Sequence, residues 1–219
     1  MLYGAEYHMW FVYTILGLYL IIPILRKWVK QSSQNEILFF LIIWGISILK
    51  LLPFFGENII NIELQYFSGY IGFIVLGYYL SIISPVKRRY AALCFLLGSA
   101  ITIYGTHYYS VLGNTFTHAF YDYLKPNVIL SAIGLFLLFK GVSIPYKWIH
   151  RAFLSISKHS YGIYLIHILV LQKITAAGVY WDMYSPIVMI PFITALVFTI
   201  SFFIIFILKK IKLISPLIG

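Results

Sequence analysis

Three side chains that can exchange protons stand at helical spacing in the last third of the chain. Ser160, Tyr164 and His167 occupy positions i, i+4 and i+7, which share one face of a helix. A hydroxyl, a phenol and an imidazole in line can form a hydrogen-bonded relay or hold an acyl donor. His167 lies about 10 Å into an apolar run, at 1.5 Å of rise per residue. Polar groups at such depth indicate a functional site, and the alternative is a polar seam between two helices.

A second group lies near the amino terminus. His8 precedes a long apolar run and has Glu6 and Trp10 beside it. A carboxylate and an imidazole at a membrane surface can act as orienting partner and base on a sugar hydroxyl, and an indole can stack on a sugar face. The alternative is an aromatic belt with a solvated histidine.

Simpler interpretations exist for the other polar residues. Lys50 can extend outward from its apolar run toward Glu57. Three residues either line an acceptor site or are plainly solvated in a loop: His107, His118 and Asp122. His150 and His159 stand among basic residues, and we expect no special role for them. No His or Cys cluster has metal-ligand spacing, so no metal is expected.

The composition indicates what surrounds these residues. The chain is 62% hydrophobic and 10% charged, whereas soluble domains are nearer half apolar and a quarter charged. A soluble fold of 219 residues would leave large apolar patches in water. In hydrocarbon every backbone polar group must be paired internally, and long continuous apolar runs indicate helices rather than strands. We therefore predict an all-α, polytopic transmembrane bundle of about seven helices.

The predicted spans are apolar runs near the length needed to cross a bilayer. They are His8–Leu25, Ile37–Phe55, Tyr66–Ile83, Tyr90–Tyr108, Val128–Phe139, Tyr161–Ala177 and Pro186–Leu208. Pro23, Pro53 and Pro85 are expected near span ends, so the broken helices typical of transporters are only weakly indicated.

Loop charges predict the topology. Of the 16 Lys and Arg residues, all but Lys50, Lys125 and Lys173 fall in alternate turns or after the last run. The opposite turns carry acidic residues, namely Glu6, Glu57, Glu63, Asp122 and Asp182. This pattern places the amino terminus outside and the carboxyl terminus in the cytoplasm. It also accounts for the net charge of +10 without a nucleic-acid partner.

Several short motifs follow one another in a recognisable order. They are Glu6–Phe11, Gly17–Leu20, Pro23–Arg26, Ser68–Gly72, Leu76–Leu80 and Ser157–His167. In spacing and order the chain resembles the membrane acyltransferase-3 family, which includes bacterial O-acetyltransferases of surface polysaccharides. It is most similar to the branch that acetylates enterobacterial common antigen.

The resemblance also implies a missing part. Family members have about ten helices, and their amino-terminal region carries an arginine and a following histidine thought to be catalytic. That region is not recognisable among these residues. We therefore expect one transmembrane acyltransferase-like domain over residues 1–219, equivalent to the carboxyl-terminal part of the family domain and with little activity by itself.

The function implied by the resemblance is O-acyl transfer, with acetyl-coenzyme A as donor and a cell-surface or lipid-linked glycan as acceptor. The protein would lie in the bacterial inner membrane, with membrane lipids and the glycan as partners. The expected catalytic residues are His8 and His167, and the expected substrate-binding residues are Glu6, Trp10, Ser160 and Tyr164. Basic cytoplasmic turns can hold the donor phosphates, although topology alone explains those charges. The alternative is a transporter or a scaffold subunit of a polysaccharide export system.

Overall fold

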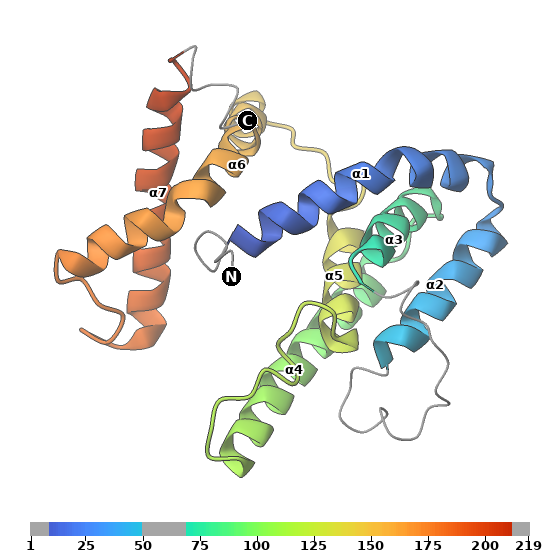
Figure 1. The fold of residues 1–219 in the computed structure, drawn as a ribbon, viewed down its shortest axis with the longest axis horizontal. Coiled ribbons are helices and arrows are strands. Elements are labelled where there is room, and N and C mark those ends of the chain that lie inside the picture. Colours follow the sequence, from blue (N-terminus) through green and yellow to red (C-terminus); the bar gives the residue numbers. More distant parts are fainter. Residues whose placement is uncertain (1–8, 50–68, 212–219) are drawn as a thin grey trace, which may run out of the picture. The chain divides into compact units, whose positions relative to one another are not determined.

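The computed structural model describes residues 9–49 and 69–211, and these residues form seven helices and no strand. The helices are α1 (Trp10–Gln31), α2 (Gln34–Leu49), α3 (Ile71–Ile82), α4 (Arg88–Leu112), α5 (Pro126–Phe139), α6 (Lys147–Ala176) and α7 (Pro186–Leu208) (Figure 1). Four of them, α1, α4, α6 and α7, are long and apolar enough to cross a membrane, and the other three are shorter. The all-α prediction is confirmed.

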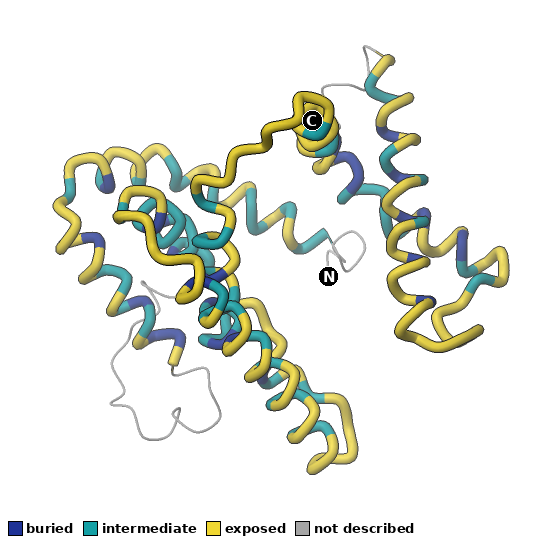
Figure 2. The backbone as a smooth tube through the Cα atoms, turned by 180° about the vertical axis from the view of Figure 1, so that it is seen from behind, coloured by how far each residue is buried: buried dark blue, intermediate teal, exposed yellow. Residues whose placement is uncertain are grey.

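The helices belong to two compact units. Among the described residues, the α1–α5 unit comprises 11–49 and 69–142, and the α6–α7 unit comprises 143–211. In both units many large apolar residues of the helices are exposed, and the tube in Figure 2 is coloured as exposed along much of each helix. Such faces are stable in lipid, where helices pair their own backbone polar groups.

Helix α6 begins well before the predicted span, which started at Tyr161. Its first turns contain Lys147, Arg151 and Lys158, whose spacing places them on one face of the helix. Trp148 falls on another face and is exposed. Helical periodicity with mixed polarity gives an amphipathic helix, which a search for continuous apolar runs cannot detect.

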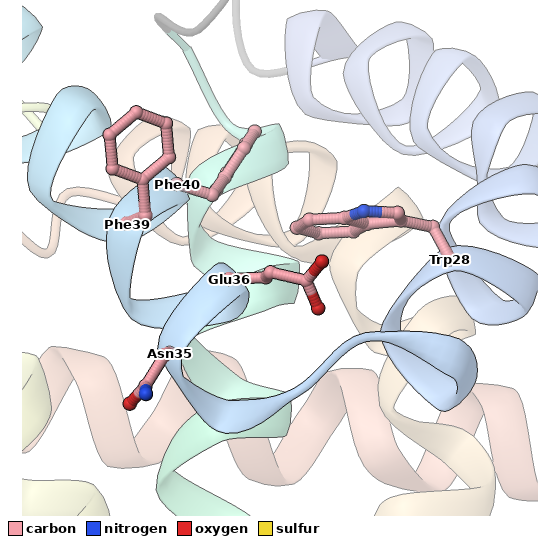
Figure 3. A pocket seen from close by; sticks show the side chains of 5 residues that line it. All are labelled: Trp28, Asn35, Glu36, Phe39 and Phe40. Carbon is pink, nitrogen blue, oxygen red and sulfur yellow. The ribbon is translucent and has the colours of Figure 1, made fainter.

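A reciprocal cap begins α2. The backbone N–H and the hydroxyl of Ser33 donate to Glu36 Oε2 at 2.6 and 2.9 Å, and the Glu36 N–H donates to Ser33 Oγ at 3.3 Å. This capping box satisfies two backbone donors and fixes the turn after α1. The hydrogen bonds from Ser33, the backbone one first, lower the pKa of Glu36. Trp28, Glu36, Phe39 and Phe40 are among the residues that line a groove of about 410 Å³. Figure 3 shows the Glu36 carboxylate directed toward the Trp28 ring.

Trp44 of α2 explains two glycines of the motif Ser68–Gly72. Its indole Nε1 donates to the Gly69 carbonyl at 3.0 Å, and Gly69 has a φ of +92°, which favours glycine. A Cβ at Gly72 would collide with the indole ring. The motif thus packs α2 against the start of α3.

The closest helix pair in the α1–α5 unit is α4 with α5. A Cβ at Gly134 would press into the backbone of Ala91 and Phe95, and a Cβ at Gly98 would press into the Asn127 carbonyl. Small residues at such contacts allow helices to approach closely in lipid.

Lys140, which follows α5, closes the carboxyl end of α3. Its ammonium donates to the carbonyl oxygens of Leu80 and Ile83, both at 2.7 Å. The last carbonyls of a helix lack partners within the helix, and the helix dipole favours a cation there. The turn after α3 and the end of α5 therefore lie at the same end of this unit, which is the arrangement that the loop charges predict.

We expect Lys140→Met to lower the free energy of unfolding by about 1.5–3 kcal/mol, since two charge-assisted hydrogen bonds are lost while the apolar stem is kept. Denaturant unfolding in detergent measures the change. The matched control is Lys147→Met, because Lys147 is exposed in the first turn of α6. Equal stability of the Lys140 variant and the wild type would contradict this capping role.

Candidate functional site

The face of α6 that packs on α7 positions the predicted residues of the last third of the chain. Buried residues of α7 recur at every fourth position: Met189, Ile193, Val197, Ser201 and Ile205. They face buried residues of α6, among them Ile163, Val170 and Ile174. A Cβ at Gly162 would meet Ile205 Cγ2 at 2.7 Å, so the two helices approach closely there.

Tyr164 and His167 lie together beside this contact. Both are half-buried, and their ring centroids are 5.6 Å apart with an angle of 38° between the ring planes. The His167 Nδ1 is 2.6 Å from the Tyr164 carbonyl oxygen. Because a carbonyl only accepts, Nδ1 must carry the proton, and the lone pair of the neutral ring lies on Nε2. This tautomer is the one in which Nε2 can act as a general base.

Ser160 lies about one turn earlier and is exposed. Its hydroxyl donates to the Ser157 carbonyl at 2.8 Å, a back-bond typical of serine in helices. Tyr164 and His167 are in ring contact. The Ser160 hydroxyl donates its proton to a carbonyl of its own helix instead of to Tyr164 or His167.

The amino-terminal group is described in part. Trp10 is half-buried and is the first residue of α1. Glu6 and His8 lie outside the described residues, so their role as base and orienting partner stays a prediction.

His159, for which no role was predicted, is buried in the contact between α6 and α7. It is 8% exposed, and its ring centroid lies 5.3 Å from Phe202 and 5.7 Å from Phe206. Its Nδ1 is 2.6 Å from the Ser155 carbonyl oxygen. His159 stands four residues before Ile163, and this spacing was the signal that it shares the buried face.

Basic residues gather at one end of the α6–α7 unit. The Lys209 ammonium, just after α7, donates to the Lys158 carbonyl, and the Lys210 Nζ lies 5.1 Å from the centre of the Phe206 ring. The turns of α6 before Lys158 therefore extend past the end of α7, carrying Lys147 and Arg151 with them.

Of the three residues predicted around the loop between α4 and α5, His107 lies in α4, and His118 and Asp122 lie in the loop. His107 lines a groove beside α4. His118 lies edge-on to Phe116, with ring centroids 4.9 Å apart, and Asp122 is exposed. Among the described residues no group of three or more His, Cys, Asp or Glu side chains could hold a metal ion.

A family model described as an acyltransferase domain matches residues 2–206. The chain belongs to the acyltransferase-3 family. The match includes all of α1 to α6 and most of α7, so both units are part of the family domain. Comparisons with curated proteins and with solved structures find no match.

Family membership and the apolar helices together identify a membrane acyltransferase. The family predicted from the motifs is therefore confirmed. Its branch, donor and acceptor stay predictions.

Proposed function

We propose that this acyltransferase-3 protein transfers an acetyl or similar short acyl group from acyl-coenzyme A to a hydroxyl of a cell-surface glycan. This proposal replaces the expectation of little activity by the chain itself, because it assigns the role of the base to His167. The observation that carries the proposal is the His167 imidazole, which lies on a half-buried face of a family member and holds its lone pair on Nε2. Transfer to a hydroxyl needs a base of this kind.

In the proposed reaction His167 Nε2 takes the proton of the acceptor hydroxyl as its oxygen attacks the thioester carbonyl. The carbon–oxygen ester bond forms and the carbon–sulfur bond breaks. The departing thiolate takes the proton back from the imidazolium, which yields coenzyme A and the acylated glycan. Tyr164 is the positioning residue, because its carbonyl fixes the tautomer of His167. His8, with Glu6 and Trp10, is the second candidate base.

The donor would approach from the cytoplasm. Lys147, Arg151 and Lys158 share a face of α6, and Lys209 lies beside Lys158. Cations in this arrangement fit the phosphates of coenzyme A, although anionic lipid headgroups attract the same residues. The protein would lie in a bacterial inner membrane with its carboxyl terminus inside, and its partners would be lipids and the glycan.

Deletion of the gene in its own host tests this function. We expect the surface glycan to lose alkali-labile acyl esters, measured by mass spectrometry, and the wild-type gene to restore them. Unchanged ester content after deletion would contradict the proposal.

The alternative is a transporter or scaffold of a polysaccharide export system. Pro23 and Pro191 lie inside α1 and α7. Both helices nevertheless continue through their prolines, unlike the broken helices typical of transporters. A deletion that lowers the amount of surface glycan without changing its ester content per sugar would favour the export role.

A further inference from the structure

We propose that the first turns of α6, residues 147–158, form an interfacial helix that lies on the cytoplasmic leaflet and binds anionic phospholipid headgroups. The proposal goes beyond a general partnership with lipids, because it names the segment and the class of lipid. It does not depend on acyl transfer, since His167 has no part in it.

These turns carry basic and apolar residues on different sides. At 3.6 residues per turn, Lys147, Arg151 and Lys158 fall within about 40° of one another around the helix axis. The apolar side comprises Trp148, Ile149, Ala152, Phe153 and Ile156. Trp148 and Phe153 are 70% and 58% exposed. A basic side opposite an apolar side with Trp and Phe is typical of helices that lie in a membrane interface.

Helix α7 covers the apolar side of α6 only after these turns. His159 and Ile163 continue that side, and both are buried. Contacts with α7 bury them, through Phe202 and Phe206 for His159 and through Ile205 for Ile163. The end of α7 is marked by Lys209, whose ammonium donates to the Lys158 carbonyl. The apolar side of the first turns therefore begins where the cover by α7 ends.

Helix α6 is bent, and its first turns run crosswise to α7. In Figure 1, α7 and the later turns of α6 lie in the plane of the picture, whereas the first turns, beside the label α6, are seen nearly end-on. Side-chain hydrogen bonds to Ser155 and Ser157 carbonyls, from His159 and Ser160, lie at the bend. Such bonds often bend helices. Since α7 can cross a membrane, a segment crosswise to its end runs along the membrane surface.

The charge of the segment selects the class of lipid. Helix α6 contains no Asp or Glu that could neutralise its cations, and anionic headgroups supply the opposite charge. Coenzyme A phosphates would meet the same basic side but would leave Trp148 and Phe153 in water. A zwitterionic lipid would cover the apolar side without net charge for the basic side. An anionic phospholipid satisfies both sides.

Spin labels on opposite sides of the helix test its position. Ala152→Cys and Leu154→Cys, each made in the full chain with Cys94→Ser, carry the labels. Both positions are exposed, and a separation of two residues places them about 200° apart around the axis. In nanodiscs that contain phosphatidylglycerol, we expect the Ala152→Cys label to collide with oxygen in the hydrocarbon. The Leu154→Cys label, on the basic side, should collide with a water-soluble nickel chelate.

Two results of the labelling would overturn the proposal. Equal collision of both labels with the nickel chelate would show a helix in water. Shielding of the Ala152→Cys label from both reagents would show that protein, rather than lipid, covers the apolar side.

Native mass spectrometry of the full chain in detergent tests the lipid class. The dissociation constant for phosphatidylglycerol should rise about fivefold in Arg151→Gln, which is the usual effect of one basic residue near an anionic surface. Lys173→Gln, in the last turn of α6, is the matched control and should leave the constant unchanged. Phosphatidylcholine should bind more weakly, and an equal concentration of coenzyme A should not displace phosphatidylglycerol.

Only variants with the thermal unfolding midpoint of the wild type are compared. Equal affinities of the wild type and Arg151→Gln, equal binding of the two lipids, or displacement by coenzyme A would overturn the proposal. Acyl transfer would still stand after such a result, because it rests on His167 and is tested by the ester content of the glycan.

Discussion

Replacement of His167 by Asn is expected to lower the rate of acyl transfer by about 10²- to 10⁴-fold, which is the usual contribution of a general base. The Asn amide can still donate to the Tyr164 carbonyl, as Nδ1 of His167 does, but it cannot take a proton from the acceptor. Release of coenzyme A, measured in membranes of the native host with a thiol reagent, gives the rate. Glycan acylation in the same cells should fall in parallel.

A matched histidine on the same helix controls for side effects. His150 is exposed near the start of α6, and His150→Asn should leave the rate unchanged. Because Asn keeps the local hydrogen bond, the thermal unfolding midpoint of His167→Asn should stay close to that of the wild type. Full transfer by a folded His167→Asn protein would exclude His167 as the base and leave His8 as the remaining candidate.

The second large effect concerns the contact between α4 and α5. Gly134→Ala places a methyl group against the backbone of Ala91 and Phe95, and a helix backbone cannot rotate away as a side chain can. We expect a loss of about 1–3 kcal/mol in the free energy of unfolding, as for other overpacked contacts. Denaturant titration in detergent, followed by circular dichroism, measures the loss.

Gly77 of α3 provides the control, because a Cβ at this position meets nothing within 4 Å. Gly77→Ala should be neutral or stabilising by up to about 1 kcal/mol, since alanine favours the helix. Equal effects of the two substitutions would show that helix propensity, rather than the contact of α4 with α5, determines the result.

The apolar runs predict the bounds of a helix correctly where the whole helix is apolar. The bounds of α7 match the predicted span, and α5 begins only two residues earlier than predicted. The start of α6 could not be found in this way, because Lys147 and Arg151 interrupt the apolar run while keeping helical spacing. A search for amphipathic periodicity is needed for such segments.

Contacts between helices explain why particular residues occur in the sequence motifs. The glycines of the motif Ser68–Gly72 contributed to the family resemblance. The indole of Trp44, in another helix, donates to the Gly69 carbonyl and would collide with a Cβ at Gly72. No local pattern contains that contact, because the two sites are 25 residues apart.

The candidate site was predictable in part. The spacing of Tyr164 and His167 placed them on one face, and the structure sets their rings side by side. The hydrogen bond from the Ser160 hydroxyl to the Ser157 carbonyl competes with the predicted relay to Tyr164 and His167. It depends on the side-chain rotamer of Ser160, which the spacing of the residues does not determine. His159 stands beside Lys158 in the sequence, which favoured a solvated side chain, whereas its contacts with Phe202 and Phe206 of α7 show that it is buried.

The most direct test of the central claim is transfer of a labelled acetyl group. Membranes containing the wild-type chain are given acetyl-coenzyme A labelled in the acetyl group and lipid-linked glycan from the deletion strain. If this chain is the acyltransferase, label appears in alkali-labile esters of the glycan, with one coenzyme A released for each ester formed. Labelling of the glycan no higher than with deletion-strain membranes would contradict this role.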